Sequence, residues 1–102
     1  MEYDIRHFKK TVTTAGTRVQ LTSSRTHVGA VMIQGLRANT GVVYFGDNSV
    51  SSTTHFASIA AGGSVQIGLD NYGNANAMID LSTIWLDAAT SGEGVMVGYL
   101  DR

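Results

Sequence analysis

Residues 28–36 read Val28-Gly29-Ala30-Val31-Met32-Ile33-Gln34-Gly35-Leu36, and this stretch decides the fold class. Successive side chains of a β-strand point to opposite faces of a sheet. The even positions supply valine, alanine, methionine and leucine, and the odd positions supply Val31 and Ile33 between glycines. Because both faces are largely apolar, the stretch predicts a strand that is central in its sheet or covered on its outer side.

Shorter strand signals surround this stretch on both sides. Residues 18–22 and 65–69 alternate polar and apolar side chains, which predicts strands with one buried face. Residues 42–45 are apolar on both faces, and residues 95–100 form a last strand. Residues 79–86 alternate as well, but the phase slips at 82–83, which indicates a bulge or a break.

Turn signals separate these strands. They are rich in glycine and asparagine, which tolerate the backbone conformations of tight turns. They lie at residues 15–16, 39–41, 46–48, 61–63, 70–76 and 91–94. Short strands at this spacing predict an all-β fold: a β-sandwich or jelly-roll-like barrel of about seven to eight antiparallel strands. We expect Val42, Tyr44, Ile67, Ile84 and Trp85 to lie mainly in its core.

The 102 residues fit a single domain. Residues 1–12 fit either a helical face or an extended segment, and we expect an N-terminal arm there, followed by one β-sandwich domain at residues 13–102. The arm offers Tyr3, Ile5 and Phe8 as residues that contact a partner protein. No apolar run reaches the roughly 20 residues that span a bilayer, so no membrane partner is expected.

The composition favours a protein covered by partners. Charged residues make up 15% of the chain, compared with about 25% in a typical soluble domain, and charge is depleted at the centres of interfaces. Proline is absent and only two lysines occur, although both residue types commonly protect exposed sheet edges. These features favour a homo-oligomer. Six basic residues lie in the first 40 residues, but they are scattered, so no nucleic-acid partner is expected.

The search for catalytic chemistry finds no known motif. The chain has no cysteine, and His7, His27 and His55 have no neighbour at metal-ligand spacing. No nucleophile elbow or phosphate-binding loop occurs. Residues 47–49 and 70–74 resemble calcium loops, but Asx-turns explain them more simply. We therefore expect a non-enzyme without metal or cofactor.

Four aromatic residues keep a second function open: Tyr44, Tyr72, Trp85 and Tyr99. Such rings form sugar-binding platforms, so a carbohydrate-binding β-sandwich module is an alternative. Exposure of Trp85 beside Tyr72 or Tyr99 would favour that alternative.

One ordered set of segments carries a family resemblance. The segments are ANTGVVYFGD at 38–47, VSS at 50–52, AAGGSVQI at 60–67, IDLSTIWLDA at 79–88 and SGEGV at 91–95. This order resembles a group of small phage virion structural proteins, over roughly residues 17–100. The resemblance implies a β-sandwich located in the virion: a capsid decoration or cement protein, or alternatively a neck- or tail-associated protein. It further implies binding to the major capsid protein or other virion proteins, and oligomers such as trimers.

Overall fold

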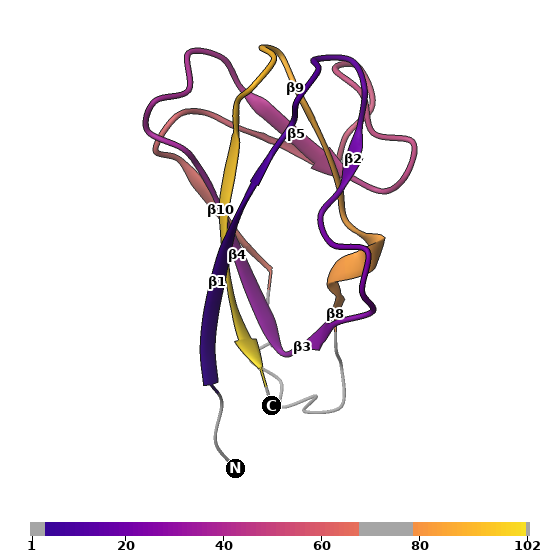
Figure 1. Ribbon diagram of the computed structural model, residues 1–102, viewed down its shortest axis with the longest axis vertical. Helices are drawn as coiled ribbons and strands as arrows, with labels where there is room; N and C mark the ends of the chain where they lie inside the picture. The colour runs from indigo at the N-terminus through magenta and orange to yellow at the C-terminus, as the bar shows by residue number, and fades with distance from the viewer. Residues whose placement is uncertain (1–3, 68–78, 102) are drawn as a thin grey trace.

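The protein is a sandwich of two four-stranded antiparallel sheets, seen from one side in Figure 1. The structure is a computed structural model, and it describes residues 4–67 and 79–101. Sheet A has the order β1 (Asp4–Thr11), β10 (Gly94–Asp101), β4 (Ala30–Gly35) and β7 (Ser64–Ile67). Sheet B has the order β2 (Val19–Gln20), β9 (Trp85–Ala88), β5 (Val43–Gly46) and β6 (Ala57–Ile59). A small third ladder joins β3 (His27–Val28) to β8 (Ile79–Asp80). The predicted all-β fold is confirmed.

The core lies between the two sheets. Its members are aliphatic side chains and one phenylalanine ring that are almost completely buried. They are Val12, Leu21, Val28, Val31, Ile33, Val43, Phe45, Ile59, Leu81, Ile84, Leu86, Ala88, Val95 and Val97. In the central strand β4, Val31 and Ile33 point inward, and β4 lies between β10 and β7 as its two-sided apolar pattern predicted.

The phase slip at residues 82–83 is a short 3₁₀ helix, η1 (Leu81–Thr83), between β8 and β9. The helix shifts the phase of the chain, so that Leu81 and Ile84 are both buried. The break predicted there is confirmed.

The expected core residues are only partly correct. In β5 the buried residues are Val43 and Phe45, whereas Val42 and Tyr44 are half-buried. Because this strand is apolar on both faces, its sequence pattern does not show which of the two alternating sets of side chains points into the core. Ile84 is buried as expected, whereas Ile67 and Trp85 are half-buried.

The segment expected to form an arm belongs to the sandwich from Asp4 onward. Strand β1 pairs along its whole length with β10, from Asp4 opposite Asp101 to Thr11 opposite Gly94. The next residue, Val12, is fully buried in the core. Residues 4–12 are therefore an edge strand and its continuation, and Phe8 and Val12 help to close the core.

Candidate interaction surfaces

The structure separates the three residues expected to contact a partner. Tyr3 lies outside the described residues. Ile5 is 83% exposed on the outer face of sheet A. Phe8, three residues further along β1, points inward, packs against the core and meets the ring of Tyr99 edge to face at 6.1 Å. Ile5 therefore belongs to the surface and Phe8 to the interior.

Ile5 forms one wall of an apolar groove on the outer face of sheet A. The strand register places it opposite Leu100, and places Met32 opposite Gly98 in the adjacent row. The groove has a volume of about 270 Å³, and Ala30 and Gln66 also line it. Gly98 has no side chain, which leaves the floor open, and Met32 is 44% exposed. The sequence feature that could have identified Met32 as part of this surface is the run of apolar even positions in residues 28–36, because it predicted a covered outer face.

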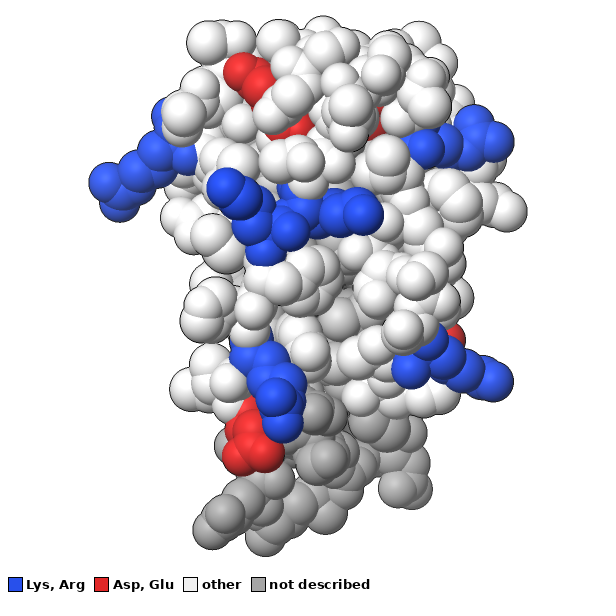
Figure 2. Space-filling model, viewed as in Figure 1, with Lys and Arg blue, Asp and Glu red and all other residues white. Residues whose placement is uncertain are grey.

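A second groove lies beside the open edge of β1. It has a volume of about 380 Å³, and its walls are β1 and the segment at 21–26. Phe8, Lys9, Lys10, Leu21, Thr22, Ser23, Thr26, Leu81 and Tyr99 line it. Figure 2, which has the same view as Figure 1, shows lysine and arginine side chains spread over this face and fewer acidic side chains. The groove is thus rimmed by ammonium and hydroxyl groups.

Both lysines of the chain lie on this edge strand. The low lysine content suggested that the sheet edges lack protection, and this inference needs correction. Strand β1 is one of the two longest strands and the only long edge, since β2, β6 and β7, the other described edges of the two sheets, have two to four residues. Lysine on an exposed edge opposes unwanted pairing, so the two lysines protect the edge that most needs it.

A polar network closes the end of the sandwich where β9 turns into β10, at the top of Figure 1. We call Asn39, Thr40, Gly41, Glu93 and Gly94 the turn cluster. The buried amide of Asn39 donates to the carbonyl oxygen of Gly94 at 2.8 Å and accepts from its N–H at 3.4 Å. The carboxylate of Glu93 accepts from both N–H groups of the 40–41 turn and from the Thr40 hydroxyl.

These hydrogen bonds lower the pKa of Glu93 below its ordinary value of 4.5. The backbone N–H groups of Thr40 and Gly41 have the largest effect, because they stabilise the ionised carboxylate. The buried carboxylate of Asp87 also accepts a hydrogen bond from a turn, from the N–H of Gly16 at 2.9 Å. The segments at 38–47 and 91–95, far apart in the sequence, therefore meet in one structural network.

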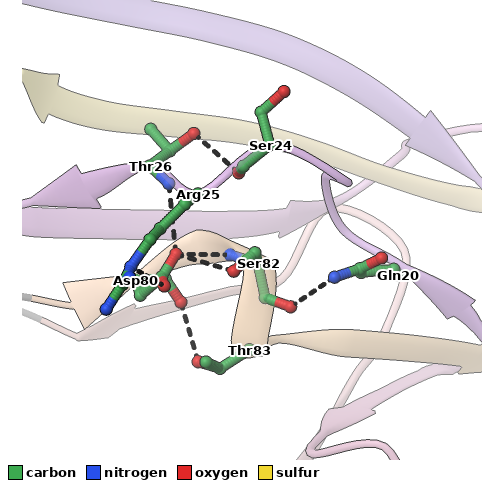
Figure 3. Close-up of polar contacts among 7 residues, drawn as sticks. All are labelled: Gln20, Ser24, Arg25, Thr26, Asp80, Ser82 and Thr83. Carbon is green, nitrogen blue, oxygen red and sulfur yellow. Dashed lines mark hydrogen bonds and ion pairs between the residues drawn. The ribbon is translucent and has the colours of Figure 1, made fainter.

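Asp80 organises a second network, drawn in Figure 3. Its Oδ1 accepts from the N–H of Thr26 and from the N–H and hydroxyl of Ser82, at 2.8–3.1 Å. Its Oδ2 lies 3.5 Å from Nε of Arg25. Burial is the largest single influence on the pKa of Asp80 and raises it, but the hydrogen bonds together hold the pKa below its ordinary value. Asp80 caps η1 and joins it to the entry of β3, which is a structural role.

The first calcium-like loop is an Asx-turn, as expected. Oδ1 of Asp47 accepts from the N–H of Ser49 at 2.9 Å and from its hydroxyl at 2.6 Å, and these bonds lower the pKa of Asp47. The second loop, 70–74, lies outside the described residues. Within residues 4–67 and 79–101, no three histidine or acidic side chains gather as metal ligands would.

Among the described aromatic residues of the sugar-platform alternative, Tyr44, Trp85 and Tyr99 make no ring contact with one another. Trp85 is half-buried on sheet B, whereas Tyr99 lies on sheet A and packs against the core. Tyr72 lies outside the described residues. Tyr44 stacks on His55 with the ring centroids 4.8 Å apart. An exposed Phe56 borders a further hollow of about 400 Å³ at the open ends of β5 and β7.

Comparisons with family models, with curated proteins and with solved structures find no match to this chain. The described residues include no helix of the length and apolar character that a membrane span requires.

Proposed function

We propose that this chain is a non-catalytic structural protein of a phage-type virion, which binds and stabilises neighbouring capsid subunits as a decoration or cement protein. A protein of this kind must offer surface that another protein can cover. The observation that carries the proposal is the apolar groove of sheet A, where Ile5 is 83% and Met32 44% exposed. Exposed apolar patches commonly mark sites of protein association.

The polar residues support the same function. The side chains of Asn39, Asp80 and Glu93 are engaged in hydrogen bonds that close turns, which accounts for them without catalysis. The low charge of the chain fits an assembled protein as well. In this proposal the protein acts as a homo-oligomer, with a trimer as the first expectation, and binds the major capsid protein. A position at the neck or tail is the alternative within the same class.

The test compares two surface variants. Ile5→Asp places a charge in the groove of sheet A, and Ser58→Asp places the same charge on the exposed outer side of β6 in sheet B. Light scattering gives the oligomer mass, and cosedimentation with virion particles that lack this chain gives binding. We expect the native protein to form an oligomer and to cosediment, Ile5→Asp to weaken both by about tenfold or more, and Ser58→Asp to change neither. A native protein that stays monomeric and does not cosediment would contradict the proposal.

A further inference from the structure

We propose that the open edge of β1 is a docking site for an extended acidic polypeptide segment, which adds to sheet A as a fifth strand. This inference uses a surface other than the apolar groove and does not depend on a virion location. It names a kind of partner by its chemistry: extended backbone and carboxylate side chains.

The backbone of β1 is prepared for such pairing. Val12 donates its N–H to Glu93 and accepts from Gly92, so its polar backbone groups face β10. Backbone groups of an antiparallel strand alternate between its two sides. The N–H and C=O groups of Ile5, His7, Lys9 and Thr11 therefore face away from β10, along the open edge of sheet A. An incoming strand matches this row of alternating donors and acceptors.

The charge of the edge selects an acidic partner. Lys9 is exposed, Lys10 half-buried, and no described carboxylate lies within ion-pair distance of either ammonium group. Opposite charges across two strands stabilise the pair, whereas like charges directly opposite destabilise it. The β1 strand of a second copy would bring its own lysines to the interface. Lys9 and Lys10 thus oppose pairing of β1 with the β1 strand of a second copy and favour an incoming strand that carries carboxylate side chains.

The groove beside the edge provides room for alternate side chains of the incoming strand. Phe8 and Tyr99 contribute rings to its floor, while Thr22, Ser23 and Thr26 contribute hydroxyl groups to the far wall. A nucleic acid fits this edge less well, because its phosphates accept hydrogen bonds but do not donate them to the open carbonyl groups of β1. The geometry therefore favours an acidic polypeptide over a nucleic acid as the partner.

The experiment is an NMR titration of the full chain with a peptide of alternating valine and glutamate, as long as the 8 residues of β1. We expect the amide signals of Ile5, His7, Lys9 and Thr11 to gain protection from hydrogen exchange. A peptide of the same sequence in which every backbone nitrogen is methylated keeps the charge but has no N–H donor on either edge, and should bind at least about tenfold more weakly.

Charge reversal provides the second arm. We expect Lys9→Glu/Lys10→Glu to weaken binding of the glutamate peptide by about tenfold or more and to favour a valine–lysine peptide instead. Arg37→Glu changes an exposed residue outside the groove and is the matched control, expected to have little effect.

Three results would overturn the proposal: no binding of the glutamate peptide at millimolar concentration, equal binding of the N-methylated peptide, or full displacement by an equimolar oligothymidine. None of these results bears on the light-scattering test of Ile5→Asp, so the two proposals fail separately.

Discussion

The turn cluster and the open edge of β1 use polar groups in opposite ways. In the turn cluster, the amide of Asn39 and the carboxylate of Glu93 are bound to backbone groups of the same chain. Along β1, four residues direct their N–H and C=O groups to an open edge, next to two lysines that form no ion pair with any described carboxylate. Satisfied polar groups stabilise a fold, whereas open ones remain available for a partner. The turn cluster is therefore expected to contribute stability at one end of the sandwich, and the open edge of β1 is the proposed place of binding along one side.

The largest expected effect concerns the half of β1 that faces the interior. Deleting residues 1–12 removes Phe8 and Val12 from the core and leaves one side of β10 without its neighbour. We expect the cooperative thermal transition in circular dichroism to disappear, because the loss of these buried side chains alone amounts to several kcal/mol, about half of a typical domain stability. A truncated chain that still melts cooperatively near the native temperature would show that β1 is an arm after all.

The next effect tests the close approach of strands at the turn cluster. A Cβ at Gly94 would overlap the carbonyl oxygen of Lys10, a backbone atom that can move aside only if strand β1 shifts with it. We expect Gly94→Ala to lower the free energy of unfolding in urea by about 3 kcal/mol. Gly16→Ala is the control, since a Cβ there meets nothing within 4 Å and only the positive φ of 86° is unfavourable, which costs about 1 kcal/mol. Equal losses in the two variants would refute the steric argument.

A smaller effect is expected from the side chain of Asn39. Asn39→Ala removes both hydrogen bonds to Gly94, so that the N–H of Gly94 loses its acceptor, whereas its carbonyl oxygen still accepts from the N–H of Leu36. We expect a loss of about 2 kcal/mol in urea unfolding. Asn48→Ala replaces an exposed asparagine in another turn and should stay within about 0.5 kcal/mol of the native protein. If the two asparagines behave alike, the turn cluster does not carry the stability assigned to it.

The smallest expected effect is a loss of stability at acidic pH. The folded protein lowers the pKa values of Asp47, Asp80 and Glu93, so the unfolded chain takes up protons first as the pH falls. The stability from these groups is therefore complete above their ordinary values of 3.8 and 4.5 and declines as the pH falls through the lowered values. Urea midpoints measured across this acidic range should decrease, and less steeply in Glu93→Gln. An unchanged slope in that variant would exclude Glu93 as a contributor.

Much of the fold could be predicted from the sequence because strand and turn signals are local. The two-sided apolar pattern of residues 28–36 predicted a central strand, and the phase slip at 82–83 predicted the interruption that η1 forms. The inward phase of β5 was missed, since Val42 and Val43 are equally apolar and only packing against sheet A selects one of them. The candidate surfaces were predicted less well: Ile5 was identified, whereas Met32 and the edge role of Lys9 and Lys10 were not.

The sequence by itself determined the all-β class, the approximate positions of the strands and the turns between them. These follow from side-chain alternation and from the preferences of glycine and asparagine, which act over a few residues. Only the tertiary structure decided that β1 is a paired edge, that Phe8 is buried while Ile5 is exposed, and that residues 39–41 meet Glu93 and Gly94. The physical reason is that these facts depend on which distant segments pair, and pairing over more than 50 residues leaves no local pattern in the chain.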